Sequence, residues 1–125
     1  MNNRLYQKKL MDHFRNPRNK KVIANTSFAS GKNNPSCGDS ISMTGIVTDG
    51  IVIDLGFEGS GCVISQAAVS MLTQKCIGMS VEMVMSLTKE DILRMIGMDL
   101  GPNRLRCALL SIETLHKGIA LLIVD

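Results

Sequence analysis

The order of apolar and polar residues predicts that the chain opens with an amphipathic helix over residues 4–15. Its apolar positions recur at intervals of three and four residues, at Tyr6, Leu10, His13 and Phe14. We interpret His13 as a packing or capping residue, and residues 16–19 (Asn-Pro-Arg-Asn) end the helix. Residues 22–36 are rich in Asn, Ser, Gly and Lys, which predicts a loop with room for a short edge strand around residues 26–30.

Between residues 40 and 59 the apolar period changes to two, which predicts a β-hairpin. The turn is Asp49-Gly50, a dipeptide typical of two-residue hairpin loops because both residues must adopt positive φ. With this loop, every residue faces the one equally far from the turn in the other strand. Cys37 then projects opposite Cys62. The alternating positions are Ile41, Met43, Gly45, Val47, Ile51, Ile53, Leu55 and Phe57.

Helical spacing returns at Cys62 and continues until Gly78. Cys62 is therefore expected at a helix N-terminus, where the helix dipole favours the thiolate, the form that binds metals and attacks electrophiles. Cys76 follows on the same helix, about 21 Å further along the axis at 1.5 Å per residue. We interpret Cys76 as a buried apolar side chain outside any site that contains Cys62.

The C-terminal third predicts three more helices. Two short ones fall within residues 80–97, each preceded by a hydroxyl residue as N-cap, and Thr88 with Asp91 resembles a capping box. Residues 101–103 (Gly-Pro-Asn) break the chain before a last helix with a continuous apolar face. Cys107 is expected in the first turn of that helix, again where a thiolate is favoured.

Length and composition indicate one domain, residues 1–125, with a formal charge of +3. Eight of the 14 basic residues lie in the first 32 positions, where Asp12 is the only acid. This segment is either a solvated basic face or a surface for an acidic protein partner. Only four aromatic residues are present, which disfavours base stacking and hence nucleic acid. The sequence has no apolar run of about 18 residues, so we expect no membrane span and a cytoplasmic protein.

The cysteines provide the candidate chemistry. In a reducing cytosol, four cysteines in one small domain favour core thiols, metal ligands or catalytic thiols over disulfides. We expect Cys37, Asp39, Cys62 and Cys107 to converge on one centre, either a tetrahedral Zn²⁺ or a 2Fe-2S cluster. Arg106 would compensate the negative charge of such a centre. On composition alone, unrelated cytosolic thiols stay an open alternative.

Four segments in order then resemble the NifU-like family of iron-sulfur cluster assembly proteins, which includes the IscU and SufU branches. They are residues 5–19, 34–39 (Asn-Pro-Ser-Cys-Gly-Asp), 59–65 (Gly-Ser-Gly-Cys-Val-Ile-Ser) and 104–107 (Arg-Leu-Arg-Cys). The resemblance implies an α+β fold in which a small antiparallel sheet with a central hairpin packs against several helices. It also implies that Cys37, Asp39, Cys62 and Cys107 are the ligands and that Cys107 is a persulfide acceptor.

The resemblance leaves the branch open. The IscU branch has His before its last cysteine and a double-proline chaperone motif upstream, whereas this chain has Arg106 and Gly101-Pro102-Asn103 there. A basic residue before that cysteine resembles SufU, but the SufU branch has a longer segment between its second and third cysteines.

Three functions follow as expectations. The first is a scaffold that receives sulfur from a cysteine desulfurase, assembles a labile 2Fe-2S cluster and transfers it to recipient apo-proteins, with Asp39 promoting release. The second is a zinc-dependent sulfur-transfer protein, which would be a sulfurtransferase if the chain is an enzyme. The third is a zinc-stabilised interaction domain without turnover. The sequence determines neither the bound metal nor the oligomeric state.

Overall fold

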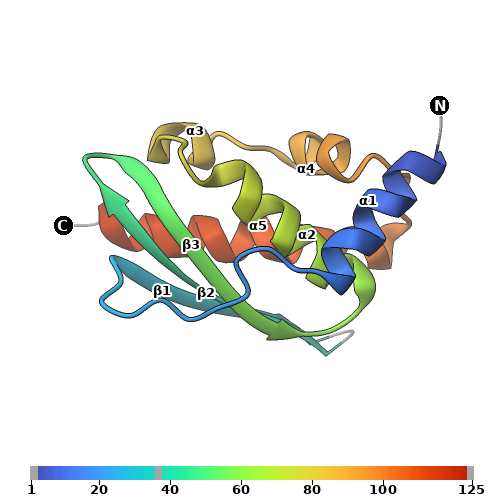
Figure 1. The fold of residues 1–125 in the computed structure, drawn as a ribbon, viewed down its shortest axis with the longest axis horizontal. Coiled ribbons are helices and arrows are strands. Elements are labelled where there is room, and N and C mark those ends of the chain that lie inside the picture. Colours follow the sequence, from blue (N-terminus) through green and yellow to red (C-terminus); the bar gives the residue numbers. More distant parts are fainter. Residues whose placement is uncertain (1–2, 36–37, 124–125) are drawn as a thin grey trace.

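The structure is a computed structural model that describes residues 3–35 and 38–123. Its elements, in chain order, are α1 (Asn3–Arg15), β1 (Phe28–Asn34), β2 (Asp39–Thr48), β3 (Ile51–Ser60), α2 (Val63–Cys76), α3 (Val81–Met85), α4 (Lys89–Ile96) and α5 (Pro102–Ile123). The strands form one antiparallel sheet in the order β1-β2-β3. Helix α5 packs against β1 and β2, α2 packs against β3 and α5, and α1 lies on α2 (Figure 1). The expected α+β architecture with a central hairpin is confirmed.

The hairpin turn is where the sequence predicts it, but the register changes after two residue pairs. Val47 faces Val52 as expected, whereas Ile46 faces Asp54, so β3 contains one extra residue. A strict alternation could not bury both Val52 and Leu55, which lie three positions apart, and the bulge resolves this conflict. As a consequence, Ile53, which is expected on the alternating apolar face, is 50% exposed.

The bulge also alters the expected partner of Cys62. Beyond Val47 the symmetric register is wrong, so the prediction that Cys37 projects opposite Cys62 loses its basis, and Cys37 itself lies outside the described residues. The last pair of the observed ladder is Ser40 with Ser60. One step further along both strands stand Asp39 and Gly61, so the shifted register brings the start of β2 to the residue before Cys62.

The sequence predicts a loop over residues 22–36 with a short strand around residues 26–30. The loop prediction is wrong for residues 31–34, because β1 extends from Phe28 to Asn34. The strand pairs with β2 along its whole length. Its polar residues find partners on α5: the Ser30 hydroxyl donates to the Thr114 carbonyl at 2.8 Å, and the Lys117 ammonium donates to the Gly31 carbonyl at 2.8 Å. These partners are more than 80 residues away in the sequence, so local composition does not reveal them.

The predicted helix boundaries are largely confirmed. Ser80 and Thr88 cap α3 and α4, and Thr88 forms the expected capping box with Asp91. Cys76 is fully buried, as interpreted from its spacing, and desolvation raises the pKa of its thiol to about 12. None of the helices in the described part of the chain combines the length and apolarity needed to cross a membrane.

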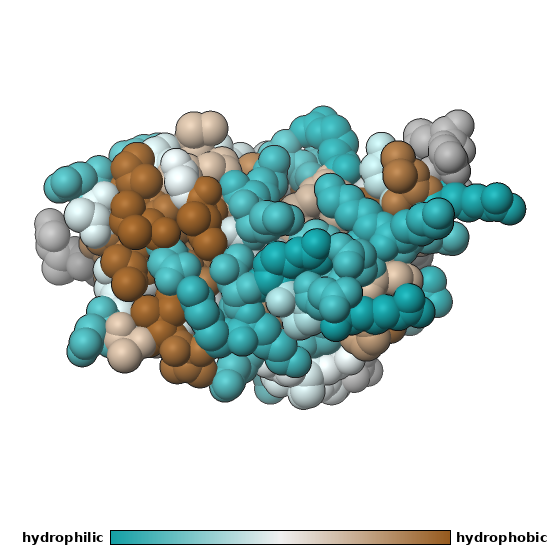
Figure 2. All heavy atoms as spheres, in the orientation of Figure 1, coloured by the Kyte–Doolittle hydropathy of each residue, from teal (hydrophilic) through white to brown (hydrophobic). Residues whose placement is uncertain are grey.

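The basic N-terminal segment forms part of a polar face. Figure 2 shows hydrophilic residues gathered over α1, whereas hydrophobic residues gather at the hairpin end of the same face. Asp12 pairs with Arg18 at 2.6 Å, so the one acid of the segment is locally neutralised.

His13 is a buried packing residue that joins α1 to α2. Its side chain is 2% exposed, and Nδ1 lies 2.8 Å from the Ser70 hydroxyl. Burial lowers the pKa of His13, and the nearby charge of Arg18 acts in the same direction. The folded protein therefore prefers the neutral imidazole.

We predict that the free energy of unfolding falls as the pH decreases from about 6.5 toward 5. In that window the unfolded chain protonates His13 at its ordinary pKa of about 6.5, whereas the folded chain resists protonation. Urea unfolding of metal-free protein at several pH values measures the effect. His13→Asn should be less stable at neutral pH but should lose less stability on acidification. Equal losses in both proteins would contradict this role.

Candidate metal centre

Asp39, Cys62 and Cys107 come from three elements, and their side chains converge. Figure 1 shows the end of the sheet at which the chain passes from β3 into α2. Asp39 is the first residue of β2, Cys62 is the N-cap of α2, and Cys107 lies near the start of α5. One carboxylate oxygen and the two sulfur atoms all lie within 4.8 Å of one another. The structure thus brings together the three expected donors that it describes.

Cys62 is held at the N-terminus of α2, as its position in the sequence predicts. Its sulfur accepts a hydrogen bond from the Ser65 N–H at 3.5 Å, which is a capping interaction. The same thiol lies 3.6 Å from Asp39 Oδ2. The residue is exposed.

Asp39 is 1% exposed and bonded to the backbone of Cys62. The Cys62 N–H donates to Asp39 Oδ1 at 3.0 Å, which leaves Oδ2 on the side of the thiol. Gly61 makes this approach possible, because a Cβ at that position would lie 2.2 Å from Asp39 Oδ1. Its φ of +149° is also a conformation that favours glycine.

Cys107 is buried, with 5% of its surface exposed. The expectation that it lies in the first turn of its helix is wrong, because α5 already begins at Pro102 and Cys107 is its sixth residue. The helix dipole acts mainly on the first turn, so it gives little reason for a thiolate here. No disulfide joins the three cysteines that the structure describes.

The other expected site residues are only partly placed. Cys37 lies outside the described residues. Arg106 is exposed and lines a surface groove of about 300 Å³ between the end of β1 and α5. The described residues show no ion pair for it, so charge compensation stays a prediction.

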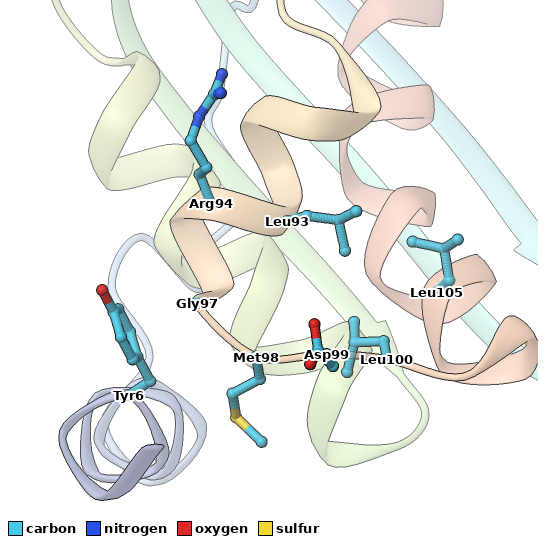
Figure 3. A pocket seen from close by; sticks show the side chains of 8 residues that line it. All are labelled: Tyr6, Leu93, Arg94, Gly97, Met98, Asp99, Leu100 and Leu105. Atoms are coloured by element: carbon cyan, nitrogen blue, oxygen red, sulfur yellow. The ribbon is translucent and has the colours of Figure 1, made fainter. Parts of the chain in front are cut away.

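A separate cavity of about 390 Å³ lies between α1, α4 and the start of α5 (Figure 3). In this cavity the ring of Tyr6 packs over Gly97. None of the three donors lines it, so the centre is not part of this cavity. Its lining residues are Tyr6, Leu93, Arg94, Gly97, Met98, Asp99, Leu100 and Leu105.

Residues 5–122 match the NifU-like N terminal domain family. The chain belongs to this family. It is 40% identical to the zinc-dependent sulfurtransferase SufU of Bacillus subtilis, over 93% of this chain and 90% of the relative. It is also 35% identical to the iron-sulfur cluster assembly scaffold protein IscU of Aquifex aeolicus, over 91% of this chain and 73% of the relative.

Solved structures confirm the fold. A candidate iron-sulfur cluster assembly scaffold protein for the SUF system of Fervidobacterium islandicum superimposes with a TM-score of 0.81. The match covers 95% of this chain and 99% of the other, at 23% sequence identity. At that identity the comparison supports the NifU-like fold and nothing finer.

The donor set of this NifU-like domain fits a thiophilic metal. Sulfur and oxygen ligands of a tetrahedral Zn²⁺ lie about 3.5 to 3.8 Å apart, given metal–ligand distances of about 2.0 to 2.3 Å. The three side chains would therefore need to close by about 1.0 to 1.3 Å at most from their 4.8 Å limit. Such a contraction is within reach of side-chain rotation.

Sequence reasoning assigned no role to two residues that shape this centre, Gly61 and Ser65. Gly61 provides the space for Asp39, and Ser65 contacts both the sulfur and the carbonyl of Cys62. The spacing of Ser65, three residues after an N-cap, is the signal that could have identified it.

We predict that Gly61→Ala destabilises the protein by about 1–3 kcal/mol through backbone strain and also weakens metal binding. The added methyl group would collide with the Asp39 carboxylate and displace it. Urea unfolding and Co²⁺ titration measure the two effects. Gly78→Ala is the matched control, because Gly78 has a φ of +95° with open space around it. Gly78→Ala should lose stability but bind Co²⁺ normally, and equal binding by both variants would refute the collision with Asp39.

Proposed function

We propose that this chain is an iron-sulfur cluster assembly scaffold. In this role it receives sulfur from a cysteine desulfurase, assembles a labile 2Fe-2S cluster and transfers the cluster to recipient apo-proteins. The observation that carries the proposal is the convergence of Asp39, Cys62 and Cys107 within 4.8 Å. The similarity to a relative that is named as an IscU scaffold supports it. A reducing compartment such as the cytoplasm suits a centre that depends on free thiols.

Cys37, which precedes Asp39 by two residues in the sequence, completes the proposed ligand set. Three thiolates and one carboxylate supply the four terminal ligands that a two-iron cluster needs. Carboxylate oxygen is a harder donor than thiolate and binds a soft centre less firmly. Asp39 is therefore the ligand that we assign to release of the cluster, and Arg106 is the cation that we assign to its negative charge.

Cys107 is the proposed acceptor of sulfur. Its thiolate attacks the terminal sulfur of the persulfide on the desulfurase. A new S–S bond forms on Cys107, the old S–S bond breaks, and the desulfurase cysteine leaves as a thiolate. Conversion of the transferred sulfur to sulfide then needs two electrons from an external reductant. Because Cys107 is 5% exposed, the desulfurase must reach it through a local opening of the centre.

The second candidate is a zinc-dependent sulfur-transfer protein, in effect a sulfurtransferase. The specific observation in its favour is the 40% identity to a relative that is named as zinc-dependent. Arg106 before the last cysteine points in the same direction. In this case the same side chains would hold Zn²⁺, which would keep the thiolates ordered until one leaves the metal to attack the persulfide. A zinc-stabilised interaction domain without turnover is the weakest of the three alternatives.

Anaerobic reconstitution with iron, sulfide and a thiol reductant tests the scaffold proposal. We expect a visible-absorbing cluster that transfers to an apo-ferredoxin, and slower transfer from Asp39→Ala because the exchangeable ligand is gone. Absorption spectra with metal and sulfide analysis measure both. Tight stoichiometric zinc without a cluster would count against the scaffold, and stimulation of the desulfurase by the zinc-loaded protein would then favour the second candidate. Chelation that unfolds the chain, together with no stimulation of the desulfurase, would establish the interaction domain.

The acceptor assignment has its own test. After incubation with a cysteine desulfurase and cysteine, intact-protein and peptide mass spectrometry should find the added sulfur on Cys107. Cys107→Ser should lose most of the persulfide, whereas Cys76→Ser, a matched change at a fully buried thiol, should keep it. If Cys107→Ser still carries the persulfide at full yield, then another cysteine is the acceptor.

A further inference from the structure

Ser65 is a buried serine beside the centre, and it is not one of the proposed metal ligands. Its exposed fraction is 0%. The hydroxyl donates to the Cys62 carbonyl at 3.1 Å, while the backbone N–H of the same serine donates to the Cys62 sulfur at 3.5 Å. The Gln66 side-chain amide donates to the Ser65 hydroxyl at 3.4 Å, which turns the hydroxyl proton toward Cys62.

These contacts fix Cys62 at three of its atoms. The nitrogen is bonded to Asp39 Oδ1, the sulfur to the Ser65 N–H, and the carbonyl oxygen to both the Ser65 hydroxyl and the Gln66 N–H, the latter at 3.2 Å. The Cys62 N–H belongs to the Gly61–Cys62 peptide unit, which Asp39 holds, and the Cys62 carbonyl belongs to the next peptide unit, which Ser65 and Gln66 hold. The backbone is therefore restrained on both sides of the Cys62 Cα, and the Ser65 hydroxyl contributes to the restraint on the helix side.

We propose that Ser65 is a positioning residue that keeps Cys62 and Asp39 in the arrangement that binds metal, including while the centre is empty. This inference rests on the proposed function, because it assumes that these side chains are ligands. Groups that hydrogen-bond to metal ligands orient them and tune their donor strength, with effects of about 10- to 100-fold on affinity when they are removed. The backbone N–H bond to the Cys62 sulfur is an interaction of this kind and is kept in Ser65→Ala, whereas the hydroxyl bond to the Cys62 carbonyl, which holds the same ligand in place, is lost.

A purely structural serine predicts a different outcome. Ser70 is such a residue: it is fully buried on the same helix, but its hydroxyl is bonded to His13 and to the Arg18 N–H. Removal of the Ser70 hydroxyl should weaken the packing of α1 and of the segment that follows it on α2. It should not change the geometry of the centre. The pair Ser65→Ala and Ser70→Ala therefore separates positioning of the ligands from general stability.

The experiment titrates the full chain with Co²⁺ under anaerobic conditions and records the thiolate-to-cobalt and d–d absorption bands. We expect Ser65→Ala to bind Co²⁺ about tenfold more weakly, with altered bands. Gln66→Ala should also weaken Co²⁺ binding, but by a smaller factor. It replaces Ser65→Ala as the test variant if Ser65→Ala does not fold. Hydrogen exchange of the Cys62 amide in metal-free protein should be faster in Ser65→Ala. Ser70→Ala should unfold at lower urea with unchanged bands and affinity.

The possible results distinguish a failure of the positioning role of Ser65 from a failure of the proposed function. Unchanged Co²⁺ affinity and bands in Ser65→Ala would overturn the positioning role and leave the proposed function intact. An equal loss of affinity in Ser70→Ala would also overturn it, because the effect would then follow from reduced stability. A native chain that binds neither Co²⁺ nor Zn²⁺ nor a cluster would overturn the proposed function together with this inference.

Discussion

The centre depends on one hydrogen bond, from the Cys62 N–H to the Asp39 carboxylate. This bond joins the first residue of β2 to the N-cap of α2, two segments that are 23 residues apart. It satisfies a buried carboxylate and a helix-terminal N–H at the same time, both of which would be costly to leave unpaired. Only glycine at position 61 lets the two groups approach, so the backbone before Cys62 is part of the site.

The sheet supplies the alignment that this hydrogen bond needs. The extra residue in β3 shifts the pairing by one position, and the ladder then ends with Ser40 opposite Ser60, which brings Asp39 close to Gly61. Without the bulge, side chains on the far part of β3 would point to the opposite face, because strand side chains alternate. A single inserted residue near the turn therefore determines both the buried face and the partner of Asp39, although the centre lies at the other end of the strands.

The two described cysteines of the centre differ in exposure, and this difference affects how a metal or a cluster could enter and leave. Cys62 is exposed and hydrogen-bonded to the backbone of its own helix, whereas Cys107 is buried on α5. The carboxylate accepts the Cys62 N–H through Oδ1, and its Oδ2 lies 3.6 Å from the Cys62 sulfur. A carboxylate that stays bonded to the backbone through Oδ1 when a metal leaves would fit the exchangeable role that we propose for Asp39.

The sequence by itself determined the elements whose signals are local. Asp49-Gly50 determined the hairpin turn, hydroxyl residues determined the starts of α3 and α4, and the return of helical spacing at Cys62 determined the start of α2, because turns, caps and periodicity act over a few residues. Family resemblance added the candidate donors. Tertiary structure decided the rest: β1 exists because α5 provides partners for its polar residues, and the bulge exists because Val52 and Leu55 must both be buried. The contact between Asp39 and the Cys62 backbone likewise depends on the tertiary structure, because it needs the shifted strand register and the space at Gly61.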